Sequence, residues 1–500
     1  MIVRPRRSDI IVILRNVGKV LLVLGAAMLL PMTLSLCLAE WKPALDLFIG
    51  ALCCFLFWGV THLTCNSSEK PSWIAGMATV ALSWLVAMIL AAIPLFLSGH
   101  FGSFLDACFD AMSGLATTGL TVIHDLDHLA YGTNLWRHLI MFLGGQGIVV
   151  IVLTFFVAGS SGATQMYIGE GREERIFPNV ISTARFIWVV SLVYFLIGTS
   201  VIWSSLLNAG LPAARGLFHS SCLFMAGYDT GGFTPQSQSV FYYHSIWVEC
   251  ATIMVMILGM LNFALHHEVW SGNRRELYRN VEVKTLGVTL FATTLIATLS
   301  LAATGTYPGA EALFRKGVYQ IISGHSGTGF MTIYGRQFVL QWAPIAMFIA
   351  IVVMGLGGAA CSTAGGIKAL RVNISARAIW IEVKKLLAPP SAVLEHHYHH
   401  CRKRLITAWV VRAVLVITAC YILAYLVGAI VVTIYGYPIS QALFESTSAC
   451  ANVGLTCGIT SPYMPALVKV TFIVQMWAGR LEFMSVFLLI AMVIGTLRGR

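Results

Sequence analysis

A chain of 500 residues would ordinarily form about three soluble domains, but 58% of these residues are hydrophobic and only 11% are charged. Soluble domains carry about 25% charged residues, so this chain has too few charges to cover a solvated exterior, and its surface must face lipid. The composition also excludes disordered, collagenous, coiled-coil and small disulfide-rich proteins. In a soluble protein the net charge of +11 would suggest nucleic acid binding; in a membrane protein it reports topology.

Apolar stretches of about 20 residues predict about ten membrane-spanning helices. They are 16–38, 45–64, 74–97, 136–159, 185–207, 245–266, 283–304, 338–360, 406–434 and 466–495. The first stretch is too long for the apolar region of a cleaved signal peptide, and we expect it to be retained. An even number of spans places both termini on the same side of the membrane.

A second class of apolar segment is about 10–14 residues long, which is too short to span a bilayer. These segments are 104–116, 213–225, 311–326 and 439–451. We expect them to form re-entrant helices, which enter the membrane and leave it on the same side.

Most of the 32 Lys and Arg residues lie between spans on the side of the N-terminus, above all in 361–405. Cytoplasmic loops of membrane proteins carry such an excess of positive charge. Both termini are therefore predicted to be cytoplasmic, and the re-entrant helices to enter from outside. The excess charge is explained by topology, so no nucleic acid partner is expected.

Four segments align on one glycine and predict a fourfold internal repeat. They read SGLATTGL (113–120), SCLFMAGY (221–228), SGHSGTGF (323–330) and SACANVGL (448–455). Each has a serine six residues before the glycine, and each follows one of the short apolar segments. A glycine turn at a helix end would explain any one of them, but not four in register.

The repeat predicts an all-α polytopic membrane protein with a central pore. Its unit is a span, a pore helix, a filter loop and a second span. Irregular backbone at membrane depth is tolerated where it is buried or lines a watery cavity, and carbonyl oxygens there can replace the hydration shell of a monovalent cation. The predicted parts are an N-terminal helix pair and then four repeats: 1–72, 73–180, 181–280, 281–400 and 401–500.

The chain resembles the TrkH-type membrane subunits of the Trk/Ktr/HKT superfamily of potassium transporters over essentially its whole length. Besides the four loops, the resemblance rests on MFLGGQGIVV (141–150), GGAACSTAGGIKALR (357–371) and GRLEFMSV (479–486). It implies K⁺ uptake across the bacterial inner membrane, with no enzymatic reaction and no cofactor. It also implies a homodimer in membrane lipid, above a cytosolic ring of RCK-type nucleotide-binding regulatory subunits.

By the same resemblance, main-chain carbonyls of the four loops would coordinate K⁺. Met225 stands where the family usually has Asn, and Gly327 where Thr is expected. Neither change removes a main-chain ligand, but lost side-chain packing would loosen the filter, so a Na⁺ or mixed alkali-cation path on the same scaffold is an alternative. The expected filter residues are Thr117, Thr118, Gly119, Met225, Ala226, Gly227, Gly327, Thr328, Gly329, Asn452, Val453 and Gly454.

Two features, one within a predicted span and one at the end of another, point to a gate. Arg480 lies between apolar stretches, where a charge is costly and therefore a functional candidate; it would repel cations below the filter, unless it forms a structural ion pair, for example with Glu482. The small-residue segment 357–366 would either allow close helix packing or break its helix and act as a movable gate. The candidate gate residues, besides Arg480, are Gly357, Gly358, Ser362, Thr363, Gly365, Gly366 and Lys368.

Other polar residues leave alternatives open. The tract HHYHHC (396–401) lacks zinc-type spacing, so we predict a solvated loop or a docking surface. A polytopic haem or metal enzyme would need paired histidines on facing spans, whereas most of the 14 histidines lie in loops or hairpins. Asp110 and Glu445 each precede a repeat serine by three residues, and either attract cations to the outer mouth or orient the loops.

Overall fold

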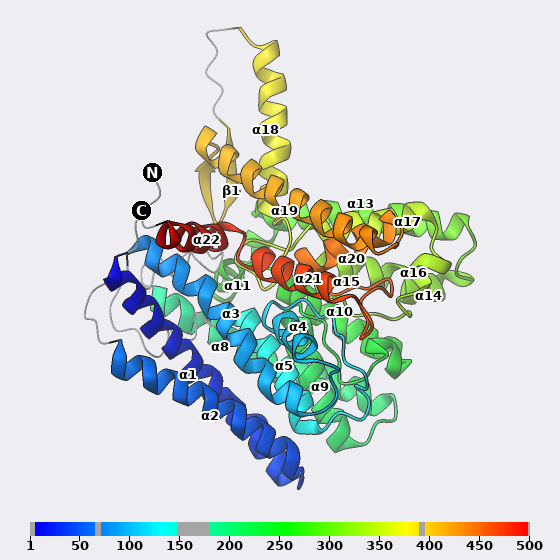
Figure 1. Ribbon diagram of the computed structural model, residues 1–500. Helices are drawn as coiled ribbons and strands as arrows, with labels where there is room; N and C mark the ends of the chain where they lie inside the picture. Colours follow the sequence, from blue (N-terminus) through cyan, green and yellow to red (C-terminus); the bar gives the residue numbers. More distant parts are fainter. Residues whose placement is uncertain (1–5, 66–71, 148–179, 390–395, 499–500) are drawn as a thin grey trace.

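The computed structural model describes residues 6–65, 72–147, 180–389 and 396–498. These ranges are almost entirely helical, with one antiparallel hairpin of two strands, β1 (His397–His400) and β2 (Arg402–Leu405) (Figure 1). The all-α membrane architecture predicted from the sequence is confirmed. The boundaries of its five parts stay predictions.

Six helices of the described ranges are long and apolar enough to cross a membrane. In each helix the backbone N–H and C=O groups bond to one another, which is necessary because lipid offers them no hydrogen-bond partners. The first two pack against each other as the expected N-terminal pair, drawn in blue in Figure 1. The six are α1 (Arg7–Cys37), α2 (Trp41–Thr64), α3 (Trp73–Leu97), α8 (Val180–Asn208), α13 (Val281–Ala303) and α19 (Ala408–Ile434).

Two predicted spans are sharply bent helix pairs instead of continuous helices. The stretch 245–266 forms α10 (Ile246–Met260) and α11 (Phe263–Trp270), which meet at 99°. The stretch 466–495 forms α21 (Ala466–Arg480) and α22 (Met484–Leu497), which meet at 113°. Hydropathy does not reveal either bend, because the two helices of each pair together have the composition of one apolar stretch.

Local chemistry explains both bends. The Asn262 side chain caps α11 by accepting a hydrogen bond of 2.7 Å from the Ala264 amide, which favours starting a new helix there. Between α21 and α22, Glu482 and Phe483 have positive φ angles of 51° and 66°, which an α-helix cannot contain.

Two further predicted spans are shorter than expected. The stretch 338–360 contains only α17 (Pro344–Gly355), after the short α16 (Gln337–Leu340). The stretch 136–159 begins within α5 (Tyr131–Gln146), and its remainder lies outside the described residues. The connecting elements are η1 (Ser239–Tyr243), α12 (Glu276–Arg279) and α18 (Ala369–Leu387), which projects from the body in Figure 1.

All four predicted short helices are present. The third is irregular, because α14 (Gly309–Leu313) and a π-helical turn, η2 (Phe314–Val318), precede its last part. The Ser103 side chain caps the first by accepting a hydrogen bond of 3.2 Å from the Asp106 amide. These pore helices are α4 (Phe104–Leu115), α9 (Ala213–Tyr228), α15 (Tyr319–Ser326) and α20 (Ile439–Cys450).

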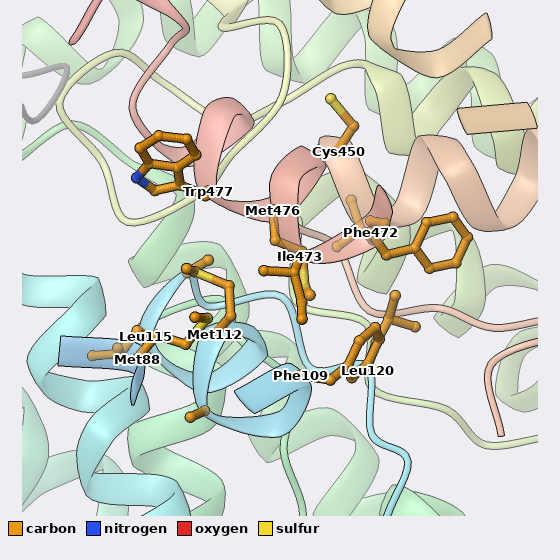
Figure 2. Packing of buried hydrophobic residues seen from close by; sticks show 14 of the residues in the cluster. Met88, Phe109, Met112, Leu115, Leu120, Cys450, Phe472, Ile473, Met476 and Trp477 are labelled. Carbon is orange, nitrogen blue, oxygen red and sulfur yellow. The ribbon is translucent and has the colours of Figure 1, made fainter. Parts of the chain in front are cut away.

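The four repeats close into a ring through one recurring contact. The helix that follows each loop packs against the pore helix of the next repeat: α5 against α9, α10 against α15, α17 against α20, and α21 against α4. Figure 2 shows the last of these contacts, where Met112 of α4 and Ile473 and Met476 of α21 belong to one buried cluster. A cyclic arrangement leaves one axis, at which the loops after the pore helices meet.

Glycines in the helices that follow the loops allow close contact with the backbone of the pore helices. A Cβ atom at Gly144 of α5 would overlap the carbonyl oxygen of Leu115, the last residue of α4. Gly259 and Gly479 stand in the same relation to the last residues of α9 and α20. The helix after each of these three loops is therefore held against the end of its own pore helix.

Gly144→Ala should destabilise the protein by about 1–3 kcal/mol, because the added methyl group forces packed backbones apart. Gly59→Ala is the matched control, since a Cβ at Gly59 of α2 meets no atom within 4 Å. We expect thermal unfolding in detergent to show a lower melting temperature for the first variant only. Equal melting temperatures would contradict the close contact.

Candidate ion pathway

Each pore helix runs into a loop with the same hydrogen bond at its base. The amide of the loop's middle residue donates to a carbonyl oxygen in the last turns of the pore helix. The four bonds are Thr118 N to Ser113 O (2.8 Å), Gly231 N to Ala226 O (2.8 Å), Thr328 N to Ser323 O (3.1 Å) and Val453 N to Ser448 O (2.9 Å). The four loops are therefore equivalent in structure and not only in sequence.

The four loops meet at a ring of glycines, Gly119, Gly232, Gly329 and Gly454, which we call the glycine ring. A Cβ at any of them would overlap a carbonyl oxygen of the next loop, in the order of the repeats, and the fourth closes on the first. The oxygens concerned belong to Gly231, Thr328, Val453 and Thr118. Side chains are excluded here, so backbone atoms from all four repeats line the axis.

Backbone angles repeat around the ring as well. The ring glycines have φ angles of 72° to 94°, and the residue two positions before each is also left-handed. Glycine adopts this region freely, but other residues adopt it at a cost of about 1 kcal/mol. Three of the four earlier positions are not glycine: Thr117 (53°), Thr230 (51°) and Asn452 (55°), with Gly327 (78°) as the fourth.

The second loop lies further along the chain than the sequence predicts. Met225, Ala226 and Gly227 belong to the end of α9 and are not in a loop; the loop residues are Thr230, Gly231 and Gly232. Ala226 occupies the place of the repeat serine, so alignment on Ser221 shifts the register. The structure therefore does not bring Met225, Ala226 and Gly227 together with the other three predicted segments.

Helix α9 continues through Gly227 to Tyr228. Gly227 packs inside the protein, where a Cβ would lie 3.2 Å from the Phe330 ring and 3.3 Å from Val255. The sequence signal that identifies the loop is Gly232-Phe233, which matches Gly119-Leu120 and Gly329-Phe330. The departure noted at Met225 therefore does not concern a loop residue, whereas Gly327 does stand in its loop.

Above the glycine ring lies a cavity of about 250 Å³. All four ring glycines line it, together with threonines from the chain that follows the loops. Such a vestibule gives access to the axis from one side. Its polar lining includes Thr121, Thr456, Thr460 and Arg137.

Glu445 holds the chain that leaves the fourth loop. Its buried carboxylate accepts hydrogen bonds from the amides of Cys457 (2.8 Å) and Ile459 (3.2 Å). It also accepts from the hydroxyl groups of Thr456 and Thr460. A carboxylate committed to four donors orients the loop and is not a free charge at the mouth.

Asp110 does the same in the first repeat. It is fully buried and forms an ion pair with Arg137, with 2.7 Å between Oδ2 and Nε. Its other oxygen accepts a hydrogen bond from the Thr121 hydroxyl. In the third repeat Gln320 takes the equivalent place and donates to the Thr332 hydroxyl oxygen (2.7 Å). Of the two alternatives left open by the sequence, these contacts favour loop orientation over cation attraction.

Arg480 lies at the other end of the loops, where α21 ends. Its guanidinium donates to the Thr117 hydroxyl oxygen (3.0 Å) and to the Gly144 (2.8 Å) and Gly145 (3.2 Å) carbonyl oxygens. It also donates to the Thr363 carbonyl oxygen. The Arg480 side chain thus connects the base of the first loop, the end of α5 and the small-residue segment.

Glu482, considered above as an ion-pair partner of Arg480, forms its ion pair with Arg371 at the start of α18. Lys368 lies directly before α18. It is buried and donates a hydrogen bond to the Ala364 carbonyl oxygen in the small-residue segment. The charged residues of this region therefore attach α18 to the bend between α21 and α22.

The small-residue segment, 357–366, breaks the helix between α17 and α18. Its ends are joined by hydrogen bonds from Gly357 N to Ile367 O (2.9 Å) and from Ile367 N to Gly355 O (3.1 Å), so it forms a closed loop. Close packing is needed too, because a Cβ at Gly365 would overlap the Ala451 carbonyl oxygen. Both structural consequences expected of small residues therefore occur together.

Polar contacts hold this segment against the ends of α9 and α10 and against α13. The Thr363 hydroxyl group contacts the carbonyl oxygens of Tyr228 (2.9 Å) and Gly259 (2.8 Å). The Ala360 amide donates to Glu282 (2.6 Å). The candidate gate residues Gly357, Gly358, Ser362, Thr363, Gly365, Gly366 and Lys368 thus lie in or beside one loop, which Arg480 contacts.

The histidine tract is ordered and partly internal, so the expectation of a solvated loop is wrong for this part of it. His400 is fully buried and hydrogen-bonded to Asn280 (3.2 Å), and His399 pairs with Glu276 (2.9 Å). Strand β1 alternates between partly and fully buried residues, which packs the hairpin against α12 and α13. No cluster of three metal-ligating side chains occurs among the residues that the structure describes.

These features define a class: a polytopic membrane protein whose four re-entrant loops meet around one axis. The chain belongs to the TrkH family of cation transport proteins, because the family model matches residues 45–495. The family expected from the sequence is therefore confirmed.

Individual relatives match along most of their length. An uncharacterized cation transporter of Methanocaldococcus jannaschii is 28% identical, over 98% of this chain and 97% of its own. The Trk system potassium uptake protein TrkH of Halomonas elongata is 26% identical, over 95% of this chain and 97% of its own. The crystal structure of the potassium transporter TrkH from Vibrio parahaemolyticus has the same fold, with a TM-score of 0.82 and 22% identity over 96% of this chain and 98% of that one.

Glu445→Ala should free the chain that follows the fourth loop, since four donors lose their acceptor. We expect the amides of Cys457 and Ile459 to exchange with solvent about tenfold faster, which corresponds to about 1.4 kcal/mol of lost local stability. Hydrogen–deuterium exchange measures this directly. Glu311→Ala is the control, because the Glu311 side chain is 72% exposed; equal exchange in both variants would contradict the orienting role.

Proposed function

We propose that the protein takes up K⁺ across a bacterial inner membrane through the axis of the glycine ring. The observation that carries the proposal is that backbone from all four repeats meets at one ring from which side chains are excluded. Main-chain carbonyl rings are the ligands that dehydrated K⁺ uses in selectivity filters. Relatives with the same fold carry the names of potassium uptake proteins.

The proposed ligands are the main-chain carbonyl oxygens of the four loops. The second set is taken from the loop that follows the end of α9, and the other three sets are those expected from the sequence. Each set combines two left-handed positions with one residue between them, which turns successive carbonyl groups. The sets are Thr117 to Gly119, Thr230 to Gly232, Gly327 to Gly329 and Asn452 to Gly454.

The membrane potential would drive the ion inward. With both termini cytoplasmic, the 250 Å³ vestibule above the ring faces outside and Arg480 faces the cytoplasm. A potential of 100 mV contributes about 2.3 kcal/mol for each K⁺ that enters. This is enough to concentrate the ion roughly 50-fold without another energy source.

The gate would consist of Arg480 and the small-residue segment. The segment lies against the second loop through Thr363, which accepts a hydrogen bond from the Thr230 hydroxyl group (3.3 Å), and Arg480 contacts both Thr363 and the first loop. A cation below the ring raises the energy of a passing K⁺. Opening therefore requires Arg480 and the segment to move away from the axis together.

Two kinds of protein partner complete the proposal. A second copy of the chain would form a homodimer, and RCK-type nucleotide-binding subunits would dock on the cytoplasmic side. Support for protein partners comes from α18, which carries exposed apolar side chains outside the ring, including Ile379, Trp380, Leu386 and Leu387. A Na⁺ or mixed alkali-cation path remains the alternative for the transported ion, because Gly327 replaces the expected Thr.

Growth of a K⁺-uptake-deficient bacterium at low K⁺ tests the ion and the corrected second loop together. The wild-type gene should restore growth, and Gly232→Ala should abolish the rescue, because its Cβ would overlap the Thr328 carbonyl oxygen. Gly227→Ala, the position expected from the sequence, should retain most of the rescue, since its Cβ meets only side chains.

The outcomes separate the alternatives. Failure of the wild-type gene with normal membrane expression would overturn K⁺ uptake. Uptake of ²²Na⁺ equal to that of ⁸⁶Rb⁺ would favour the mixed-cation path. If Gly227→Ala abolishes rescue and Gly232→Ala does not, the second loop is misplaced.

Arg480→Ala should raise basal ⁸⁶Rb⁺ flux into proteoliposomes roughly tenfold, the effect of lowering a barrier by about 1.4 kcal/mol. Arg412→Ala is the matched control, because Arg412 lies within the apolar α19 but is exposed on its surface. Unchanged flux in Arg480→Ala would instead favour a purely structural role for its hydrogen bonds.

A further inference from the structure

A second cavity, of about 280 Å³, lies beside the small-residue segment and away from the glycine ring. It is enclosed by the first turns of α18, the first turns of α19, the β hairpin and the bend after α21. Ala360 and Cys361 of the small-residue segment form part of its wall. The ion pathway proposed above does not use this cavity.

The cavity is cationic. Lys368, Arg371 and Arg404 line it against a single carboxylate, Glu482. The N-terminus of α18, a helix of 19 residues, opens into the same place, and its first turn contains no acidic residue. A helix N-terminus adds partial positive charge, so the cavity favours an anion.

One wall of the cavity is apolar and borders the membrane. Val410, Ala413, Val414 and Ile417 come from the first turns of α19, one of the six helices apolar enough to span a bilayer. Trp409 lies at its edge with 75% of its surface exposed. Tryptophan at the end of a spanning helix is typical of the membrane–water interface.

We propose that this cavity binds the headgroup of an anionic phospholipid. The phosphate group would lie among Lys368, Arg371 and Arg404, and an acyl chain would lie along the apolar face of α19. Basic pockets between spanning helices on the cytoplasmic side are suited to anionic headgroups. A free phosphate ion fits the same cations, but it makes no use of the apolar wall.

The site is connected to the small-residue segment by two contacts. Lys368 donates to the Ala364 carbonyl oxygen inside the segment, and Arg371 pairs with Glu482, two residues after Arg480. A phosphate group attracts both cations and weakens both contacts. Bound lipid therefore loosens the segment and favours conduction, a consequence that rests on the proposed function, whereas binding itself does not.

Binding is tested by native mass spectrometry of the delipidated full chain with phosphatidylglycerol or phosphatidylcholine added. Arg404→Gln is the test variant, because Arg404 lines the cavity, is exposed and lies on a strand. Lys403→Gln is the matched control: it removes the same charge from the neighbouring residue, which does not line the cavity.

We expect the wild type and Lys403→Gln to retain phosphatidylglycerol in preference to phosphatidylcholine, and Arg404→Gln to bind it at least about threefold more weakly. Equal retention of both lipids by the wild type, or equal binding by the two variants, would overturn the site. Ten millimolar inorganic phosphate should not displace the lipid; displacement would assign the cavity to a free anion and overturn the lipid proposal.

The effect on conduction is measured as ⁸⁶Rb⁺ flux into vesicles of pure phosphatidylcholine, and into vesicles of one part phosphatidylglycerol to two parts phosphatidylcholine. The surface charge of phosphatidylglycerol attracts cations whichever variant is present. We therefore compare, between variants, the ratio of the flux into the mixed vesicles to the flux into the pure phosphatidylcholine vesicles. The ratio should be at least about threefold higher for wild type and Lys403→Gln than for Arg404→Gln, and equal ratios would overturn the link to the gate. If no vesicle shows flux, the proposed function fails, and the binding result still decides the site.

Discussion

Close contact between backbones at the glycine ring is the constraint on which the rest of the structure depends. Backbone polar groups at membrane depth must be buried or face water, and at the ring each loop lies directly against the next. That contact requires each pore helix to end where its loop reaches the next loop. It also requires the helices after the loops to lie against them, and Gly144, Gly259 and Gly479 allow this approach in three of the repeats.

Buried and half-buried charges hold this arrangement from both sides. On the vestibule side, Asp110 with Arg137 and the four-donor Glu445 fix the chain that leaves the loops. On the opposite side, Arg480 and the pair of Arg371 with Glu482 fix the small-residue segment. A buried charge that loses its partner costs several kcal/mol, so each of these contacts has a strongly preferred geometry.

The second repeat illustrates the limit of reading repeats from sequence alone. Three loops share a serine six residues before the ring glycine. In the second repeat, Ser221 of α9 also precedes a glycine by six residues, but neither residue belongs to the loop. The hydrogen bond from Gly231 to Ala226 (2.8 Å) identifies the true register, because it depends on backbone geometry and not on residue type. The bends before Phe263 and after Arg480 escaped prediction for a related reason: the two arms of each together have the composition of one apolar stretch.

By itself, the sequence determined the environment and the family of this protein. Its apolar runs are long enough for lipid, its short helices recur four times, and its motifs are those of TrkH-type transporters, because length and hydrophobicity are local properties of the chain. Tertiary structure decided which glycines meet, what Arg480 contacts and how Asp110 and Glu445 are used. These depend on pairs of residues distant in sequence, such as Gly119 with Gly231, whose proximity no local pattern encodes.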